Sequence, residues 1–189
     1  MDKLIKDEYM NQPLPNPKKS PTGKPVAIVT GGATGIGAAC CRALADAGFH
    51  VGIHYRTSKS GADEILSDIS GNGFLLQADL EDPDQVETMV RQIKDETGRV
   101  DVLVNNAGMS INEPMLTMKL ETFDRQRAML RGVWLLTKRV LRMFMLRQPE
   151  GRIINISSVV GHIGNAGQMP YTMEKAALDA MTRSLAKEL

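Results

Sequence analysis

The chain has 189 residues, of which 42% are hydrophobic and 24% are charged, and its 23 basic and 22 acidic side chains leave a net charge of +1. This balance gives no reason to expect a nucleic acid or an anionic membrane as partner. No apolar run approaches the roughly 20 residues of a membrane-spanning helix. Adjacent Cys40 and Cys41 cannot form a framework disulfide, and the N-terminus has no apolar targeting core. We therefore expect a cytoplasmic protein.

Residues 1–24 are predicted to be a flexible tail. They contain the segment Pro13–Pro21, in which closely spaced prolines cannot sustain a helix or a ladder strand. The rest of the chain, residues 25–189, has a length and composition that predict one folded domain.

Short apolar runs alternate with amphipathic stretches from residue 25 onward. The runs predict strands over Val26–Thr30, Val51–Tyr55, Phe74–Ala78, Val102–Asn105 and Arg152–Ser157. Their dense apolar character is typical of strands that are covered on both faces. Because helices are predicted between the strands, the pattern indicates an α/β fold: a doubly wound parallel sheet, Rossmann-like, of about five strands with helices on both faces.

One of these helices has clear end signals. Asp82 is the expected N-cap, Pro83 occupies the first helical position, and Gln85 completes a start that resembles a capping box. Gly98 is expected to end the helix.

A glycine-rich turn joins the first predicted strand to the first helix, which runs to Ala47. The turn reads Thr30-Gly31-Gly32-Ala33-Thr34-Gly35-Ile36-Gly37. Glycines let the backbone turn sharply and approach a pyrophosphate, and the N-terminus of the helix offers N–H groups to the phosphates. An ordinary tight turn is the alternative, but the position between strand and helix favours dinucleotide binding.

The turn resembles the T-G-x-x-x-G-x-G fingerprint of the short-chain dehydrogenases/reductases, and further motifs of that family follow in order. These are Asp79-Leu80, Asn105-Asn106-Ala107-Gly108, Ser158, Tyr171 and Lys175. The resemblance covers residues 25–189. Within it, the segment Gly164–Gln168 is similar to that of the 3-oxoacyl-acyl-carrier-protein reductases.

The spacing of Tyr171 and Lys175 places them one helical turn apart on the same face, so the lysine can lower the pKa of the phenol and make it a proton donor for a developing alkoxide. The resemblance implies that Lys175 also holds the nicotinamide ribose and that Ser158 orients the substrate carbonyl. A surface Tyr–Lys pair is the alternative. The implied cofactor-binding positions are Thr30, Gly31, Thr34, Gly35, Ile36, Gly37, Arg56, Asp79, Leu80, Asn106, Ala107, Gly108, Tyr171 and Lys175.

The end of the second strand bears on the choice of cofactor. NAD-binding members of this fold place a carboxylate there, whereas this chain reads His54-Tyr55-Arg56-Thr57-Ser58. Arg56 could meet a 2′-phosphate, which favours NADP(H); a solvated loop arginine is the alternative. The three histidines are scattered without metal-ligand spacing, so no metal site is predicted.

Two departures from the family pattern stand out. Gln126 and Arg127 fall on the apolar face of a long helix predicted over residues 120–147, and Met129 occupies the place of an asparagine that in the family supports the proton relay. We expect this relay to be lost. The sequence also stops near the end of the helix that carries Lys175, without the two further strands that the family pattern contains.

Three hypotheses follow. The first is an NADP(H)-dependent reductase that converts a ketone to a secondary alcohol, with a 3-oxoacyl thioester, free or bound to a carrier protein, as its substrate in fatty acid biosynthesis. The second is a non-catalytic dinucleotide-binding fragment, and the third is a polyol or sugar dehydrogenase of the same family. The resemblance also implies a homo-oligomer that pairs through the helix of residues 120–147 and the one starting at Pro170.

Overall fold

The computed structural model describes residues 22–189. Of the predicted tail, residues 1–21 lie outside the described residues. The strands are β1 (Val26–Val29), β2 (His50–Tyr55), β3 (Gly73–Gln77), β4 (Val102–Asn105) and β5 (Arg152–Asn155). The helices are α2 (Gly35–Asp46), α3 (Lys59–Asp68), α4 (Pro83–Glu96), α5 (Leu120–Met143), the 3₁₀ turn η1 (Met145–Arg147), α6 (Val160–Ile163) and α7 (Met169–Glu188).

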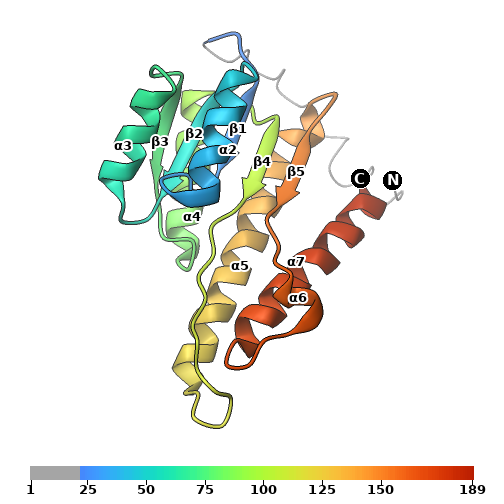
Figure 1. Ribbon diagram of the computed structural model, residues 1–189. Coiled ribbons are helices and arrows are strands. Elements are labelled where there is room, and N and C mark those ends of the chain that lie inside the picture. Colours follow the sequence, from blue (N-terminus) through green and yellow to red (C-terminus); the bar gives the residue numbers. More distant parts are fainter. Residues whose placement is uncertain (1–21) are drawn as a thin grey trace.

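The strands form one parallel sheet in the order β3-β2-β1-β4-β5 (Figure 1). The first strand, β1, lies at the centre of the sheet. The chain then adds β2 and β3 on one side of β1, and β4 and β5 on the other. This reversal creates a topological switch point between β1 and β4, and open α/β sheets bind ligands beyond the carboxyl ends of strands at such points. The predicted fold class is confirmed; the bounds of β4 agree with the prediction, and those of the other strands differ by one or two residues.

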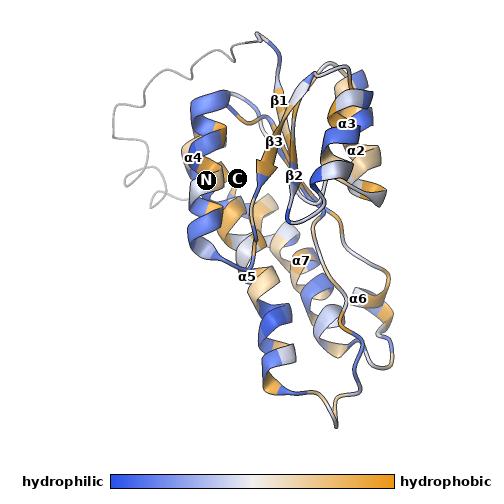
Figure 2. Ribbon diagram, turned by 90° about the vertical axis from the view of Figure 1, so that its left-hand side faces the viewer, coloured by the Kyte–Doolittle hydropathy of each residue, from blue (hydrophilic) through white to orange (hydrophobic). Residues whose placement is uncertain are grey.

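The central strand, β1, consists entirely of apolar residues. Val26 and Ile28 pack into one cluster with residues of α4 and α5, whereas Ala27 and Val29 pack into another with residues of α2 and α3. All four side chains are fully buried. Because alternate residues of a strand face opposite sides of the sheet, a strand covered on both faces needs apolar residues at every position. Figure 2 shows β1 and β3 largely in the hydrophobic colour, whereas the helices alternate between hydrophilic and hydrophobic residues.

The start of α4 follows the predicted capping pattern with one difference. The carboxylate of Asp82 accepts hydrogen bonds from the backbone N–H groups of Asp84 (2.9 Å) and Gln85 (3.4 Å), and Pro83 occupies the first turn. The Gln85 amide oxygen, however, accepts from the backbone N–H of Asp79 at 2.8 Å. The cap of α4 therefore also holds the end of the third strand in place.

Helix α5 ends at Met143, and a 3₁₀ turn continues the predicted helix to residue 147. Gln126 is buried on its inner face, as predicted, with 1% of its surface exposed. The prediction for Arg127 was wrong: its side chain is 67% exposed and lies 3.6 Å from Asp124. A helix turns by about 100° per residue, so only one of two adjacent residues can occupy the centre of a buried stripe.

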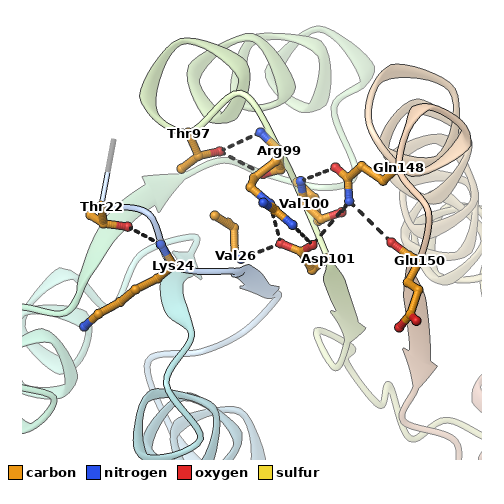
Figure 3. Close-up of polar contacts among 9 residues, drawn as sticks. All are labelled: Thr22, Lys24, Val26, Thr97, Arg99, Val100, Asp101, Gln148 and Glu150. Atoms are coloured by element: carbon orange, nitrogen blue, oxygen red, sulfur yellow. Dashed lines mark hydrogen bonds and ion pairs between the residues drawn. The ribbon is translucent and has the colours of Figure 1, made fainter. Parts of the chain in front are cut away.

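The amino edge of the sheet is closed by a network around Asp101 (Figure 3). The carboxylate of Asp101 accepts hydrogen bonds from the backbone N–H of Val26 (2.7 Å), from the Arg99 guanidinium and from the Gln148 amide. Gln148 also bonds both backbone groups of Val100. The network ties the starts of β1 and β4 to the turn before β5, and its polar groups satisfy one another.

Candidate active site

The carboxyl ends of β1 and β4 are joined by side chains of the predicted cofactor motifs. The Thr30 hydroxyl donates to the Val104 carbonyl (3.2 Å) and accepts from the N–H groups of Asn106 (2.9 Å) and Ala107 (3.0 Å). The Asn106 amide in turn donates to the carbonyls of Thr30 and Gly31. The structure thus brings the turn at residues 30–37 against the segment that follows β4.

The glycines of the turn are required by its geometry. Gly31 and Gly35 have φ angles of +63° and +54°, a region that residues with a Cβ rarely adopt. A Cβ on Gly37 would lie 2.1 Å from the Gly31 carbonyl oxygen and 2.6 Å from the Asn106 amide nitrogen. The N-cap residue Thr34 makes no side-chain cap hydrogen bond, so it leaves the first N–H groups of α2 uncapped. A helix N-terminus of this kind, next to a close backbone turn, suits a pyrophosphate.

His54 was not predicted as a site residue, yet it supports this turn. It is 2% exposed, its Nδ1 accepts from the Gly31 N–H (3.0 Å), and its Nε2 lies 3.0 Å from the Ala78 carbonyl. Since Nδ1 accepts, the proton resides on Nε2. Burial lowers the pKa of His54 to about 4, so the ring is neutral at pH 7. A histidine within a strand that is buried on both faces needs hydrogen-bond partners, and this was the signal available in the sequence.

The corner beyond β2 differs from the expectation. Arg56 lies 2.9 Å from Glu81 and 3.8 Å from Asp79, so the structure supplies carboxylates from the segment after β3. Glu81 is also approached by Arg125, at 3.4 Å, and its carbonyl accepts from Arg131. The Arg56 side chain remains 41% exposed and can therefore still reach a ligand.

Asp79 and Leu80, which were expected to contact the cofactor, occupy different environments. The Asp79 side chain is 33% exposed and borders this corner. Leu80 is 2% exposed and belongs to the apolar cluster under α5, and a Cβ on Gly132 would lie 1.9 Å from its carbonyl oxygen. Any contact of Leu80 with a ligand would therefore be made by its backbone.

Tyr171 and Lys175 meet at the same edge of the sheet. The Lys175 ammonium lies 5.5 Å from the centre of the Tyr171 ring and donates to the Ile156 carbonyl at 3.0 Å. A Cβ on Gly108 would be 3.3 Å from Lys175 Nζ, which places the lysine beside the segment that follows β4. Burial lowers the pKa of Lys175, and the carboxylates of Glu174 and Asp179 oppose that shift.

Ser158 lies in the loop between β5 and α6. Its Oγ accepts from the backbone N–H of Val160 at 3.4 Å, which leaves the hydroxyl proton available to a carbonyl oxygen. A Cβ on Gly161, in the adjoining short helix, would lie 3.1 Å from the Cβ of Lys175. The loop that carries Ser158 is therefore packed against the helix that carries Tyr171 and Lys175.

The segment Gly164–Gln168 is fastened to the long loop between β4 and α5. The Gln168 amide donates to Ser110 (2.9 Å) and Asn112 (2.8 Å), and the Gly167 carbonyl accepts from the N–H of Glu113. These contacts hold the loop after β4 against the segment before α7, three residues along the chain from Tyr171.

The short chain dehydrogenase family model matches residues 25–189. The chain belongs to the short-chain dehydrogenase family. Among curated relatives, it is 42% identical to a 3-oxoacyl-[acyl-carrier-protein] reductase of Synechocystis and 41% identical to one of Vibrio cholerae. These matches cover 87% of this chain and 68% and 67% of the respective relatives.

Solved structures share the fold of this chain. A blue fluorescent protein from a metagenomic library, in complex with NADPH, matches with a TM-score of 0.81 and 36% identity, over 87% of this chain and 68% of that one. Acetoin dehydrogenase from Enterobacter cloacae matches with a TM-score of 0.83 and 30% identity, over 88% and 68% of the two chains.

In this member of the short-chain dehydrogenase family, Met129 occupies the position where the family pattern led us to expect an asparagine. It is 6% exposed and packs among the apolar residues of α4 and α5. A thioether sulfur accepts hydrogen bonds weakly and donates none. Gln126, about one turn earlier in α5, is buried and donates to Glu174 on α7.

Within residues 22–189, none of the helices is long and apolar enough to span a membrane. The same residues contain no group of three or more His, Cys, Asp or Glu side chains placed to hold a metal ion.

Proposed function

We propose that the chain binds NADP(H) and reduces a ketone to a secondary alcohol. The observation that carries this proposal is the buried Lys175 ammonium beside the Tyr171 ring, at the sheet edge that also holds the glycine turn. The fit to a dinucleotide is good: the turn excludes any Cβ at Gly37, and Arg56 is exposed enough to meet a 2′-phosphate. The relative crystallised with NADPH supports the choice of cofactor.

The chain's own residues supply the acid chemistry. The bound nicotinamide would provide the hydride. The Ser158 hydroxyl donates to the substrate carbonyl oxygen and orients it, and the Tyr171 hydroxyl transfers its proton to the alkoxide that forms. Lys175 stabilises the resulting phenolate by Coulomb attraction, because its charge is shielded from water.

A 3-oxoacyl thioester carried by an acyl-carrier protein is the substrate we propose. The support is the naming of several curated relatives, 37–42% identical, as 3-oxoacyl-[acyl-carrier-protein] reductases. We also propose a cytoplasmic location, which both cysteines suit because they are free thiols.

A homo-oligomer that pairs through α5 and α7 is proposed as well. The two helices border an apolar groove in which Trp134 is 50% exposed. The groove is lined by Trp134, Thr137, Lys138, Leu141, Arg142, Leu146, Met181, Ser184, Leu185, Glu188 and Leu189. Light scattering on the purified chain tests this: a monomer at all concentrations would contradict it.

The catalytic proposal is tested with purified protein. We expect NADPH to raise the melting temperature more than NADH does, and NADPH oxidation to follow on addition of acetoacetyl thioester. Tyr171→Phe should lower kcat by about 100-fold or more while leaving NADPH binding intact, because only the proton donor is removed. Binding without turnover would favour a non-catalytic dinucleotide-binding protein, and turnover confined to polyols or sugars would favour the third hypothesis.

A further inference from the structure

A buried carboxylate lies directly beside the lysine of the site. Glu174 is 3% exposed and Lys175 is 4% exposed. One carboxylate oxygen of Glu174, Oε2, accepts a hydrogen bond from the amide of Gln126. The same amide nitrogen donates to the Met109 carbonyl at 2.9 Å. Glu174 is therefore anchored by Gln126 of α5, which the loop after β4 holds in turn.

The second oxygen of Glu174 is turned toward the lysine. Among the described residues, Oε1 has no hydrogen-bond partner, and it lies 3.8 Å from Lys175 Nζ. A Cβ on Gly108 would lie 3.3 Å from Nζ and 3.7 Å from Oε1, so both atoms border the same small space. The ammonium donates to one carbonyl, that of Ile156, and has further N–H groups to share.

The charges around the lysine favour a role for this carboxylate. Removal from water destabilises the ammonium, and Glu174 opposes this more strongly than Asp179, which lies one turn further along α7. Asp179 is itself 3.3 Å from His162 on α6. Burial raises the pKa of Glu174, while Gln126 and then Lys175 act in the opposite direction. Each member of the buried pair therefore stabilises the charged form of the other.

We propose that Glu174, held by Gln126, is a positioning residue that keeps Lys175 charged and fixed beside Tyr171. The inference rests on the proposed function for its catalytic meaning, although the geometry itself does not depend on a bound cofactor. Glu174 and Gln126 would then provide the polar contact to Lys175 that the thioether of Met129 does not provide.

The test is the pKa of Lys175, measured by NMR titration of the lysine side-chain signals in the protein without cofactor. Lys175→Met assigns the signal. In Glu174→Gln we expect the pKa of Lys175 to fall by about 1 unit, because an opposite charge within 4 Å is lost. Glu150→Gln, an exposed carboxylate before β5, is the control and should leave the value unchanged. An unchanged pKa in Glu174→Gln would overturn the proposal.

Comparison with Glu174→Asp separates charge from packing. If Glu174 served only to fill space, the isosteric glutamine would behave like the wild type and the shorter aspartate would be worse. The proposal expects Glu174→Asp to keep the pKa of Lys175 near the wild-type value and Glu174→Gln to lower it. In Glu174→Gln the alkaline limb of the kcat profile should also move to lower pH, with little change in KM. If Glu174→Gln does not fold, Gln126→Met removes the anchor and keeps the charge; it should produce a smaller fall, and no fall would contradict the proposal.

The two proposals can fail separately. A chain that shows the Lys175 shift but neither binds NADPH nor turns over substrate would overturn the proposed function alone. A chain that binds and reduces normally, but whose lysine does not respond to Glu174→Gln, would overturn this inference alone.

Discussion

The two edges of the sheet hold polar networks of opposite character. At the amino edge, Asp101, Arg99 and Gln148 satisfy one another and the backbone around them. At the carboxyl edge, within residues 22–189, Glu174 Oε1 and Gln126 Oε1 are buried without hydrogen-bond partners, and α2 lacks a side-chain cap. Buried polar groups are normally hydrogen-bonded, so unsatisfied ones mark places where a ligand or proton is expected. One sheet thus separates an edge that stabilises from an edge that can react.

At the carboxyl edge, both ring nitrogens of His54 have partners, as the polar groups of the amino edge do. The titration of His54 gives the largest expected effect on the free energy of unfolding. Below about pH 6.5 the unfolded chain takes up a proton at this residue, whereas the folded chain does so only near pH 4. Stability should therefore fall as the pH drops through this window, by up to about 3 kcal/mol. Urea unfolding at several pH values measures it. His54→Asn should lack this component, and identical pH profiles for the two proteins would contradict the assignment.

Asp101 tests whether the amino edge is purely structural. In Asp101→Asn the Val26 N–H, the Arg99 guanidinium and the Gln148 amide lose a charged acceptor, which should cost about 2 kcal/mol of unfolding free energy. NADPH affinity of the folded protein should not change, because the residue lies at the opposite edge. If Asp101→Asn lost much of its NADPH affinity without losing stability, the amino edge would not be purely structural.

Arg56 gives the smallest expected effect. Arg56→Ala should reduce the preference for NADPH over NADH about 10-fold, equivalent to about 1.4 kcal/mol, if the guanidinium meets the 2′-phosphate. Glu81→Gln should raise the affinity for NADPH, because it weakens the competing ion pair at 2.9 Å. Titration calorimetry with both cofactors measures the two effects. If neither variant changes the affinity for NADPH, Arg56 only forms a surface ion pair and does not bind the cofactor.

Much of the fold and part of the candidate site were predictable from the sequence. The strands were found because they are runs of mostly apolar residues, and α4 because Asp82 and Pro83 mark its start. The glycine turn was predicted because its glycines stand between a strand and a helix, and the structure shows that a Cβ on Gly37 would clash. Sequence reasoning missed His54 and Glu174, since a histidine or glutamate in a strand or helix pattern does not show which partners will surround it.

What the sequence by itself determined is local: the order of strands and helices, the glycine-rich turn between β1 and α2, and the spacing that sets Tyr171 one helical turn from Lys175. The tertiary structure alone decided which distant groups meet. It brought Gln126 to Glu174 across 48 positions of the chain and Glu81 to Arg56 across 25. The physical reason is that spacing along a helix or strand follows from backbone geometry, whereas the burial and partners of a charge depend on how those elements pack.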